Sequence, residues 1–193
     1  MVAGSSPVRR VTIKIIFGEL YMIIRKAFIH EIDNIMLIYE EARIFMRSIG
    51  NGSQWGDTFP LRDTIISNIN NNDFYVCVNE PAETNETNEI FEIFGVFYFK
   101  IENEPTYNRI DDGAWLNDEP YGVVHRLASS RKIKGTGAFC LDWCEKQCKN
   151  IRIDTHRDNI TMRKVLEKSG YIYCGIIYVA NGSERMAYQK IIT

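Results

Sequence analysis

Two segments in the first half of the chain carry apolar residues at helical spacing. Between residues 31 and 48 apolar side chains recur every three or four positions, and the Gly-Asn-Gly sequence at 50–52 is of a kind that ends helices. Pro60 suits the first turn of a second helix, whose apolar face extends to Ile69. The pattern therefore predicts two amphipathic helices joined by a short connection that contains several glycines.

Runs of β-branched and aromatic residues predict the strands. These runs cover residues 22–27, 74–78, 91–101, 121–128, 151–154, 171–179 and 185–192. A polar, acidic turn is expected at 81–88, and Asn181-Gly182 is a strong hairpin signal between the last two strands. Two further helices are expected at 137–149 and after Asp158, which we expect to cap the second of them. The order of elements is thus β-α-α-β-β-β-α-β-α-β-β, which mixes helices and strands in one α/β unit.

Length and composition indicate an ordinary globular protein. The chain has 193 residues, enough for one domain, with 45% hydrophobic and 25% charged residues. A net charge of −2 does not favour a nucleic-acid or membrane-surface binder, and no apolar run reaches the roughly 18 residues of a membrane span. We therefore expect no nucleic-acid and no membrane partner.

The cysteines point to a reducing compartment. Their number is odd and no clear secretory signal precedes them, which predicts free thiols in the cytoplasm. They have no CxxC or Cys/His spacing typical of zinc sites, so no metal is expected and burial as small apolar side chains is the better interpretation. The five are Cys77, Cys140, Cys144, Cys148 and Cys174.

Residues 1–21 are expected to lie outside the domain, which would cover residues 22–193. Met22 begins an apolar strand pattern that completes the element order, and the preceding segment resembles a signal peptide only faintly. Two interpretations stay open for the extension. It is either upstream sequence outside the natural protein, or an additional strand in which Val11, Ile13 and Ile15 alternate.

The segment from 123 to 138 is the most informative part of the chain. An apolar strand runs into a short basic loop, and Gly135 and Gly137 then open a helix. A helix start presents unpaired N–H groups and a partial positive charge, so it can hold a phosphate. A P-loop would need Lys and a hydroxyl side chain where Ala138 and Phe139 stand, and a dinucleotide fingerprint would need glycine at Cys140. Both of these phosphate-binding loops are therefore excluded.

Two motifs resemble the GNAT acyltransferases. The sequence at 132–137, Lys-Ile-Lys-Gly-Thr-Gly, resembles the family's (Gln/Arg)-x-x-Gly-x-(Gly/Ala) loop, with Lys in the first position. The segment from Asn159 to Tyr171 resembles the family's Asn-x-x-Ala…Gly-Phe segment, with Met162 at the small-residue position. The element order matches the GNAT fold over residues 22–192. The resemblance implies a single-domain GNAT fold with a mixed, mostly antiparallel central sheet flanked by helices.

The resemblance also implies transfer of an acetyl group from acetyl-CoA to an amine. In the family the fourth and fifth strands splay apart, pantetheine pairs with backbone of the fourth, and the pyrophosphate sits on the amides of the glycine loop. Asn159 would contact the cofactor from the next helix, although it also fits an ordinary helix start. The residues expected to bind CoA are Leu127, Ala128, Ser129, Lys132, Lys134, Gly135, Thr136, Gly137, Ala138 and Asn159.

An attacking amine must be neutral, so the reaction needs a base. His125 is the only side chain of its strand that changes charge near neutral pH. Alternation places it on one face with Leu127, and Glu119 and His156 are the rival bases. The resemblance also implies a tyrosine that gives a proton to the departing CoA thiolate, but Leu166 stands at that position. Either another tyrosine gives this proton, or the thiolate leaves without receiving one. The nearby candidates are Tyr171, Tyr173 and Tyr178.

The acceptor is expected to be an amine of a small molecule or a peptide. Gln54 and Trp55, in the connection between the first two helices, are expected to form a wall of its pocket, and the acidic loop at 102–119 could attract a cation. The alternative function is a non-catalytic acyl-CoA-binding protein on the same fold. Exposed edge strands are also compatible with a homodimer.

Overall fold

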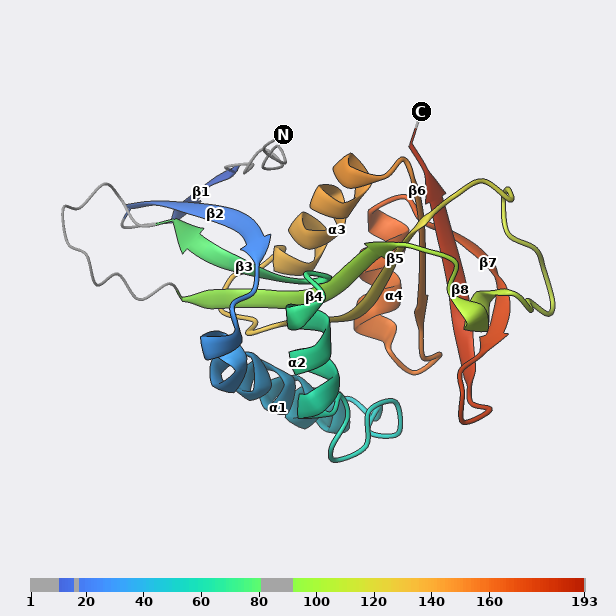
Figure 1. Ribbon diagram of the computed structural model, residues 1–193, viewed down its shortest axis with the longest axis horizontal. Coiled ribbons are helices and arrows are strands. Elements are labelled where there is room, and N and C mark those ends of the chain that lie inside the picture. Colours follow the sequence, from blue (N-terminus) through green and yellow to red (C-terminus); the bar gives the residue numbers. More distant parts are fainter. Residues whose placement is uncertain (1–10, 16–17, 81–91, 193) are drawn as a thin grey trace.

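The computed structural model describes residues 11–15, 18–80 and 92–192 (Figure 1). The turn expected at 81–88 lies outside the described residues. Of residues 1–21, only the backbone of 11–15 and 18–21 is described, and side chains are described from Met22 onward.

The strands form one sheet of eight, in the order β1-β2-β3-β4-β5-β6-β8-β7. Neighbours are antiparallel except for β5 and β6, which are parallel. The strands are β1 Val11–Ile15, β2 Gly18–Lys26, β3 Phe74–Glu80, β4 Ile93–Ile101, β5 Gly122–Ser129, β6 Asn150–Thr155, β7 Ile172–Tyr178 and β8 Glu184–Ile191. The predicted mixed, mostly antiparallel sheet is confirmed. β2 begins four residues earlier than the expected strand, and β1 pairs with it at the edge of the sheet.

Four α-helices accompany the sheet in the described part of the chain: α1 Ile32–Ser48, α2 Arg62–Asn70, α3 Thr136–Gln147 and α4 Ile160–Lys168. Short 3₁₀ turns, at Ile29–Glu31 and Pro105–Tyr107, supplement them. The expected cap at Asp158 is wrong by one residue. The Asn159 side chain accepts the hydrogen bond from the Met162 amide at 3.1 Å, because its backbone occupies the position just before the first helical residue.

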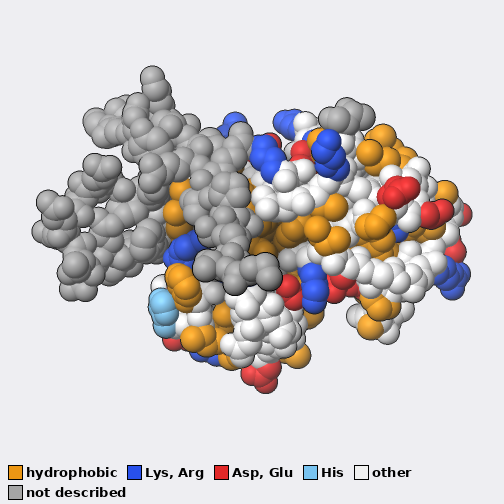
Figure 2. Space-filling view, turned by 45° about the horizontal axis from the view of Figure 1, so that its top comes forward, with side chains coloured by type: hydrophobic (Ala, Val, Ile, Leu, Met, Phe, Trp, Pro, Cys, Tyr) orange, Lys and Arg blue, Asp and Glu red, His pale blue; other side chains and the backbone are white. Residues whose placement is uncertain are grey.

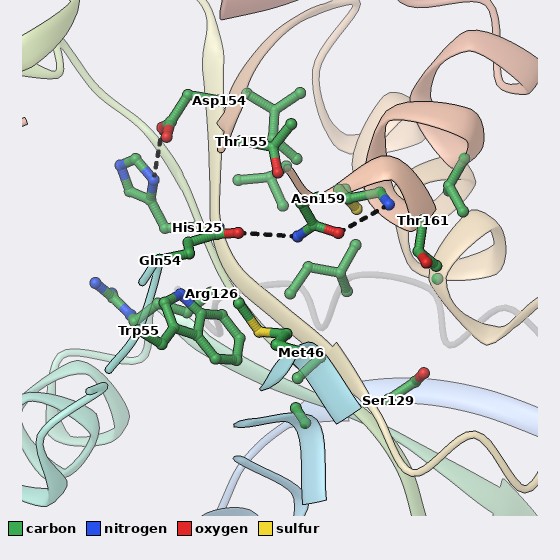
Figure 3. A pocket seen from close by; sticks show the side chains of 18 of the residues that line it. Met46, Gln54, Trp55, His125, Arg126, Ser129, Asp154, Thr155, Asn159 and Thr161 are labelled. Carbon is green, nitrogen blue, oxygen red and sulfur yellow. Dashed lines mark hydrogen bonds and ion pairs between the residues drawn. The ribbon is translucent and has the colours of Figure 1, made fainter. Parts of the chain in front are cut away.

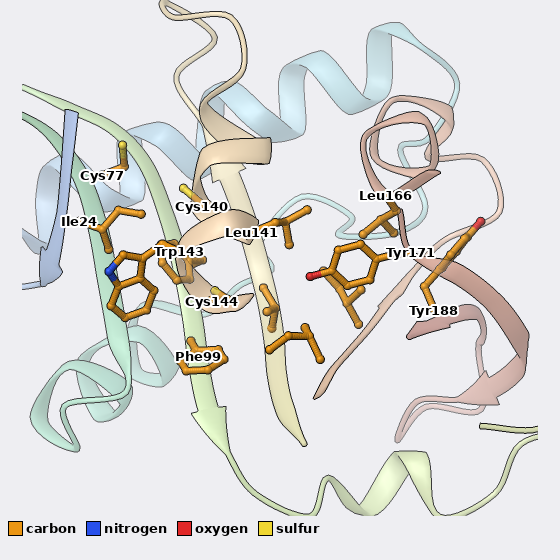
Figure 4. Close-up of a cluster of buried hydrophobic side chains, with 14 of the residues drawn as sticks. Ile24, Cys77, Phe99, Cys140, Leu141, Trp143, Cys144, Leu166, Tyr171 and Tyr188 are labelled. Atoms are coloured by element: carbon orange, nitrogen blue, oxygen red, sulfur yellow. The ribbon is translucent and has the colours of Figure 1, made fainter. Parts of the chain in front are cut away.

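The two faces of the sheet carry separate hydrophobic cores. Along β4, Val96 and Tyr98 pack with α1 and α2, whereas Phe97 and Phe99 pack with α3 and α4, as the alternation of side chains in a strand requires. α1 and α2 therefore cover one face and α3 and α4 the other (Figure 1). Trp143 of α3 lies in the second core beside Cys140 and Cys144 (Figure 4). Cys77 and Cys174 are buried as well, whereas Cys148 is half-buried, so the predicted burial is confirmed for four of the five cysteines.

A bulge in β5 changes the expected alternation. Tyr98 pairs with His125 and Val96 with Ala128, so Arg126 and Leu127 together face one residue of β4. Arg126 has the left-handed φ of 54° that such a bulge requires. The placement of Leu127 on the same face as His125 is therefore wrong: Leu127 packs against the core under α3, opposite to the His125 side.

β5 and β6 pair over only three residues. Their register runs from Gly122–Ile151 to Val124–Ile153, and beyond it no described strand pairs with β5 on that side. The backbone of β5 from His125 to Ser129 consequently has one edge free for a ligand. This divergence opens the cavity in which the candidate site lies.

A polar network fixes the long loop before β5. The Asn150 amide donates to Asn117 Oδ1 and to the carbonyl oxygens of Glu119 and Pro120, and Gln189 bridges Asn117 and Asn150. The guanidinium of Arg152 stacks over the rings of two loop aromatics, Trp115 and Tyr121. The loop is therefore held against β6 and β8, which gives Glu104 at its beginning a defined position.

The visible surface mixes both signs of charge. Positive and negative side chains are interspersed over the described face in Figure 2, in keeping with the small net charge. Among the described residues, no helix is both long enough and apolar enough to cross a membrane.

Candidate active site

A cavity of about 1020 Å³ lies where β5 and β6 diverge. Its walls come from the connection between α1 and α2, from β5 and β6, from the loop before α3, from the start of α4 and from the β7–β8 hairpin. Segments far apart in the sequence thus meet at one place.

Nine of the ten residues expected to bind CoA line this cavity. They are Leu127, Ala128, Ser129, Lys134, Gly135, Thr136, Gly137, Ala138 and Asn159. Lys132 is the exception: its Nζ lies 2.5 Å from the Glu92 carboxylate, outside the cavity. The sequence could not reveal this, because the pair joins a loop to the start of β4, forty residues away in the chain.

The start of α3 has the geometry of an anion cradle. Gly135 precedes the helix with a φ of +93°, a conformation in which a side chain would be strained. A Cβ added at Gly137 would meet nothing within 4 Å, so the backbone there faces open space. Thr136 Oγ1 donates to the Ile133 carbonyl at 2.9 Å and fixes the turn. Since the first turn of a helix leaves amide N–H groups unpaired, these residues fit a phosphate group.

Asn159 links the start of α4 to the connection between α1 and α2. Its Nδ2 donates to Gln54 Oε1 at 3.0 Å, and the same oxygen accepts from the Asn51 amide at 2.8 Å (Figure 3). Trp55 lines the cavity and also packs edge-to-face on Tyr39 with 5.5 Å between ring centroids. Gln54 and Trp55 therefore both lie in the cavity wall, as predicted.

His125 lies in the cavity between two carboxylates. Its Nε2 is 3.2 Å from Glu104 Oε2 and its Nδ1 is 3.6 Å from Asp154 Oδ1 (Figure 3). The Tyr107 hydroxyl donates to the same Asp154 oxygen at 2.8 Å. The hydrogen bond from His125, together with those from Thr106, lowers the pKa of Glu104 to about 2 in spite of burial. This pair therefore keeps a carboxylate charged beside the imidazole.

The two rival bases lie outside the cavity. Glu119 is exposed, and its backbone carbonyl accepts from Asn150. The His156 imidazole contacts Asp158 instead, with Nδ1 3.5 Å from a carboxylate oxygen, and burial followed by the charge of Arg185 lowers the pKa of His156. Among the predicted bases, only His125 lines the cavity.

No tyrosine is among the described residues that line the cavity. Leu166 is fully buried in the core, Tyr171 is buried beside it, and Tyr173 is 44% exposed on β7. Tyr178 lies against the guanidinium of Arg109. The three tyrosines considered as acids are therefore not placed at the site.

Sequence reasoning missed Glu104, Asp154, Arg126 and Arg185, which all line the cavity. The acidic character of the 102–119 loop was visible in the sequence, but the one carboxylate that reaches His125 was not distinguishable from its neighbours. Asp154 is the last residue but one of β6, a position from which side chains often reach a site at the edge of the sheet. This was the available signal for it.

Comparison with solved structures decides the family. A GNAT-family acetyltransferase from Streptococcus agalactiae 2603 is 35% identical to this chain, with a TM-score of 0.76 over 89% of this chain and 96% of that one. The chain belongs to the GNAT acetyltransferase family. Neither a scan of protein-family profiles nor a search of curated proteins finds a match.

More distant structures share the fold of this GNAT acetyltransferase. A GNAT-family acetyltransferase from Listeria monocytogenes 4b F2365 is 19% identical, with a TM-score of 0.64 over 94% of this chain and all of that one. The yncA protein of Salmonella typhimurium, solved with its cofactor acetyl-CoA, is 12% identical, with a TM-score of 0.55 over 89% of this chain and 94% of that one. These two structures share the fold, and the predicted family is confirmed by the Streptococcus agalactiae protein.

Proposed function

We propose that this protein is an acetyl-CoA-dependent N-acetyltransferase that acts on an amine of a small molecule or peptide, with His125 as the base. The observation that carries the proposal is that one cavity contains both an anion cradle and a candidate base. The cradle is at the start of α3, and the base is the β5 histidine, which lies between two carboxylates. The five free cysteines support a cytoplasmic location.

The cradle and the free edge of β5 would hold the cofactor. The amides of the first turn of α3 suit the pyrophosphate, and the unpaired backbone from Leu127 to Ser129 suits the amides of pantetheine. Lys134 adds a positive charge to the cavity wall near the cradle. When bound, acetyl-CoA supplies the acetyl thioester that an amine attacks.

His125 is placed to take the proton that the amine must lose. A neutral imidazole that donates its Nε2–H to Glu104 accepts this proton on Nδ1, and the carboxylates of Glu104 and Asp154 stabilise the imidazolium that results. Because hydrogen bonds lower the pKa of Glu104 to about 2, its side chain is a carboxylate near neutral pH and offsets a positive charge on the ring. Tyr107 orients Asp154, so the ring is held from both sides.

The leaving thiolate needs no acid in this site. A thiol has a pKa near 8.5, so its thiolate leaves readily near neutral pH. This fits a cavity whose described lining contains no tyrosine.

Replacement of His125 by alanine tests the base. We expect kcat for a reactive amine to fall by roughly 10²–10⁴-fold, the usual effect of removing a positioned base, with CoA affinity nearly unchanged. The matched control is His30→Ala, since His30 is exposed, stacks on Phe28 and lies outside the cavity. A folded His125→Ala protein with wild-type kcat would exclude the base. A wild-type protein that binds CoA but acetylates no amine in a broad panel would instead be an acyl-CoA-binding protein.

Replacement of Gly137 by glutamate tests the cradle. The added side chain starts in open space, so the fold should tolerate it, but its charge would repel a pyrophosphate. We expect calorimetry to show loss of CoA binding in Gly137→Glu and largely retained binding in Gly137→Ala, the control for backbone effects. Equal CoA affinity in both variants would place the pyrophosphate elsewhere.

A further inference from the structure

Three arginines line the cavity without a carboxylate partner among the described residues, and two of them, Arg126 and Arg185, are also partly buried. Arg126 and Arg185 both line it, and in the described part of the chain no carboxylate oxygen lies within 4.0 Å of either group. Arg126 donates from Nη2 to Asn68 Oδ1 at 2.7 Å, while its buried Nε has no hydrogen-bond partner among the described residues. Arg185 donates only to the backbone carbonyl of Glu184, at 2.8 Å.

These two cations are partly removed from water. Burial lowers the pKa of both arginines, which expresses the free-energy cost of holding a charge in the cavity wall. Tyr98 offsets part of this cost for Arg126, whose guanidinium lies 5.0 Å from the ring centroid. A buried charge without an ionic partner is ordinarily unfavourable, so a bound anion would stabilise this arrangement.

The nearby carboxylates are already engaged. Glu104 accepts hydrogen bonds from His125 and from Thr106, and Asp154 accepts from Tyr107 and faces His125. The negative charges of Glu104 and Glu102 raise the pKa of Arg126, and that of Asp154 raises the pKa of Arg185. In each case the carboxylate oxygens lie more than 4.0 Å from the guanidinium nitrogens. Among the described residues, the positively charged donors left over beside these carboxylates are therefore the two arginines.

Their position assigns the anion to the acceptor rather than to the cofactor. Arg126 directly follows His125 and points to α2 through Asn68, away from the α3 side of the sheet, where the cradle lies. Arg185 belongs to β8, which pairs with β6 beside Asp154. Arg126 is thus the neighbour of His125 on β5 (Figure 3), and Arg185 is close enough to Asp154 for that carboxylate to act on its charge.

We propose that the acceptor carries a carboxylate or a phosphate on the same small molecule as its amine, and that Arg126 and Arg185 bind this anion while His125 receives the proton of the amine. The inference rests on the proposed function and adds the class of acceptor to it. Guanidinium groups suit both anions because their planar N–H donors match pairs of oxygens.

Matched acceptors test this specificity. At saturating acetyl-CoA, kcat/KM would be measured for β-alanine against β-alaninamide and for phosphoethanolamine against ethanolamine, with a peptide bearing a free N-terminus as a further arm. We expect the preferred anionic member to exceed its neutral counterpart by about 10–150-fold, the range for hydrogen bonds to charged groups. The two pairs distinguish a carboxylate from a phosphate, and a preference for the peptide over both anionic amines would overturn the proposal.

Variants assign the effect to the arginines. Arg126→Gln and Arg185→Gln should each lower kcat/KM for the anionic acceptor at least about tenfold more than kcat/KM for the neutral one. Arg62→Gln, which breaks a surface pair with Asp33 outside the cavity, is the matched control. Arg185→Gln keeps the test valid if Arg126→Gln fails to fold, because the Arg185 side chain makes a single hydrogen bond within the described part of the chain, to a neighbouring backbone carbonyl. An equal loss for neutral and anionic acceptors would overturn the proposal.

A binding measurement separates this inference from the proposed function. N-acetyl-β-alanine and its uncharged amide would be titrated into the CoA-saturated protein by calorimetry. Preference for the acid, lost in Arg185→Gln, supports the anion site even if no amine is turned over. Equal binding of acid and amide would exclude it, whatever the acetylation assays show.

Discussion

Replacement of Glu104 by glutamine removes the negative charge beside His125 and preserves the size of the side chain. The pKa of Glu104 is about 2, against an ordinary value of 4.5, and the hydrogen bond from His125 is the largest cause. Each unit of pKa difference corresponds to about 1.4 kcal/mol, so the charged Glu104 carboxylate stabilises the folded state by at most about 3 kcal/mol. The side chain is 18% exposed, so we expect about 1–3 kcal/mol after solvent screening.

The sign of the pH dependence follows from the lowered pKa. A carboxylate with a lowered folded-state pKa stabilises the fold above its ordinary pKa, and this contribution is lost as the pH falls through the folded value. The difference in unfolding free energy between wild type and Glu104→Gln should therefore be complete near pH 5.5. It should shrink between pH 4.5 and pH 2, where the wild-type carboxylate also becomes neutral.

Urea denaturation at a series of pH values from 5.5 down to 2.5 measures this difference directly. Glu40→Gln is the matched control, because Glu40 is an exposed carboxylate on α1 and should show almost no difference at any pH. A constant gap between wild type and Glu104→Gln over this range would refute the charged pair with His125. A gap that grows toward low pH would contradict the sign of the pKa shift.

Two further predictions concern the fold around the site. Gly95→Ala should destabilise the protein by about 1–3 kcal/mol and weaken CoA binding, because the new Cβ would lie 2.8 Å from Thr136 Cγ2 at the start of α3. Thermal melting and CoA titration measure the two effects. An unchanged melting temperature would contradict the close contact. A shortened chain beginning at Met22 keeps the pairing of β2 with β3 from Met22 to Lys26, so it should retain CoA affinity and melt within a few degrees of the full chain. A large loss of stability would instead show β1 to be an integral strand.

The sequence alone predicted the features that depend on local chemistry. Helical periodicity located α1 and α2, β-branched runs located the strands, and Asn181-Gly182 marked the hairpin between β7 and β8. The cradle was also visible, because a glycine with positive φ and a helix start are properties of a few consecutive residues. The resemblance to the GNAT family implied ten CoA-binding residues, and nine of them line the cavity.

Features that depend on pairing across the sheet were decided only by the tertiary structure. The bulge at Arg126 reversed the face of Leu127, and a strand read as strictly alternating gives no sign of such an extra residue. Lys132 turned to Glu92, and Glu119 and His156 lay outside the cavity, although their residue types were as suitable as those of the residues inside. The partners of His125 illustrate the reason most clearly. Glu104 lies 21 residues before it and Asp154 comes from the neighbouring strand, and a contact between distant residues is fixed by how strands and loops pack rather than by any local pattern.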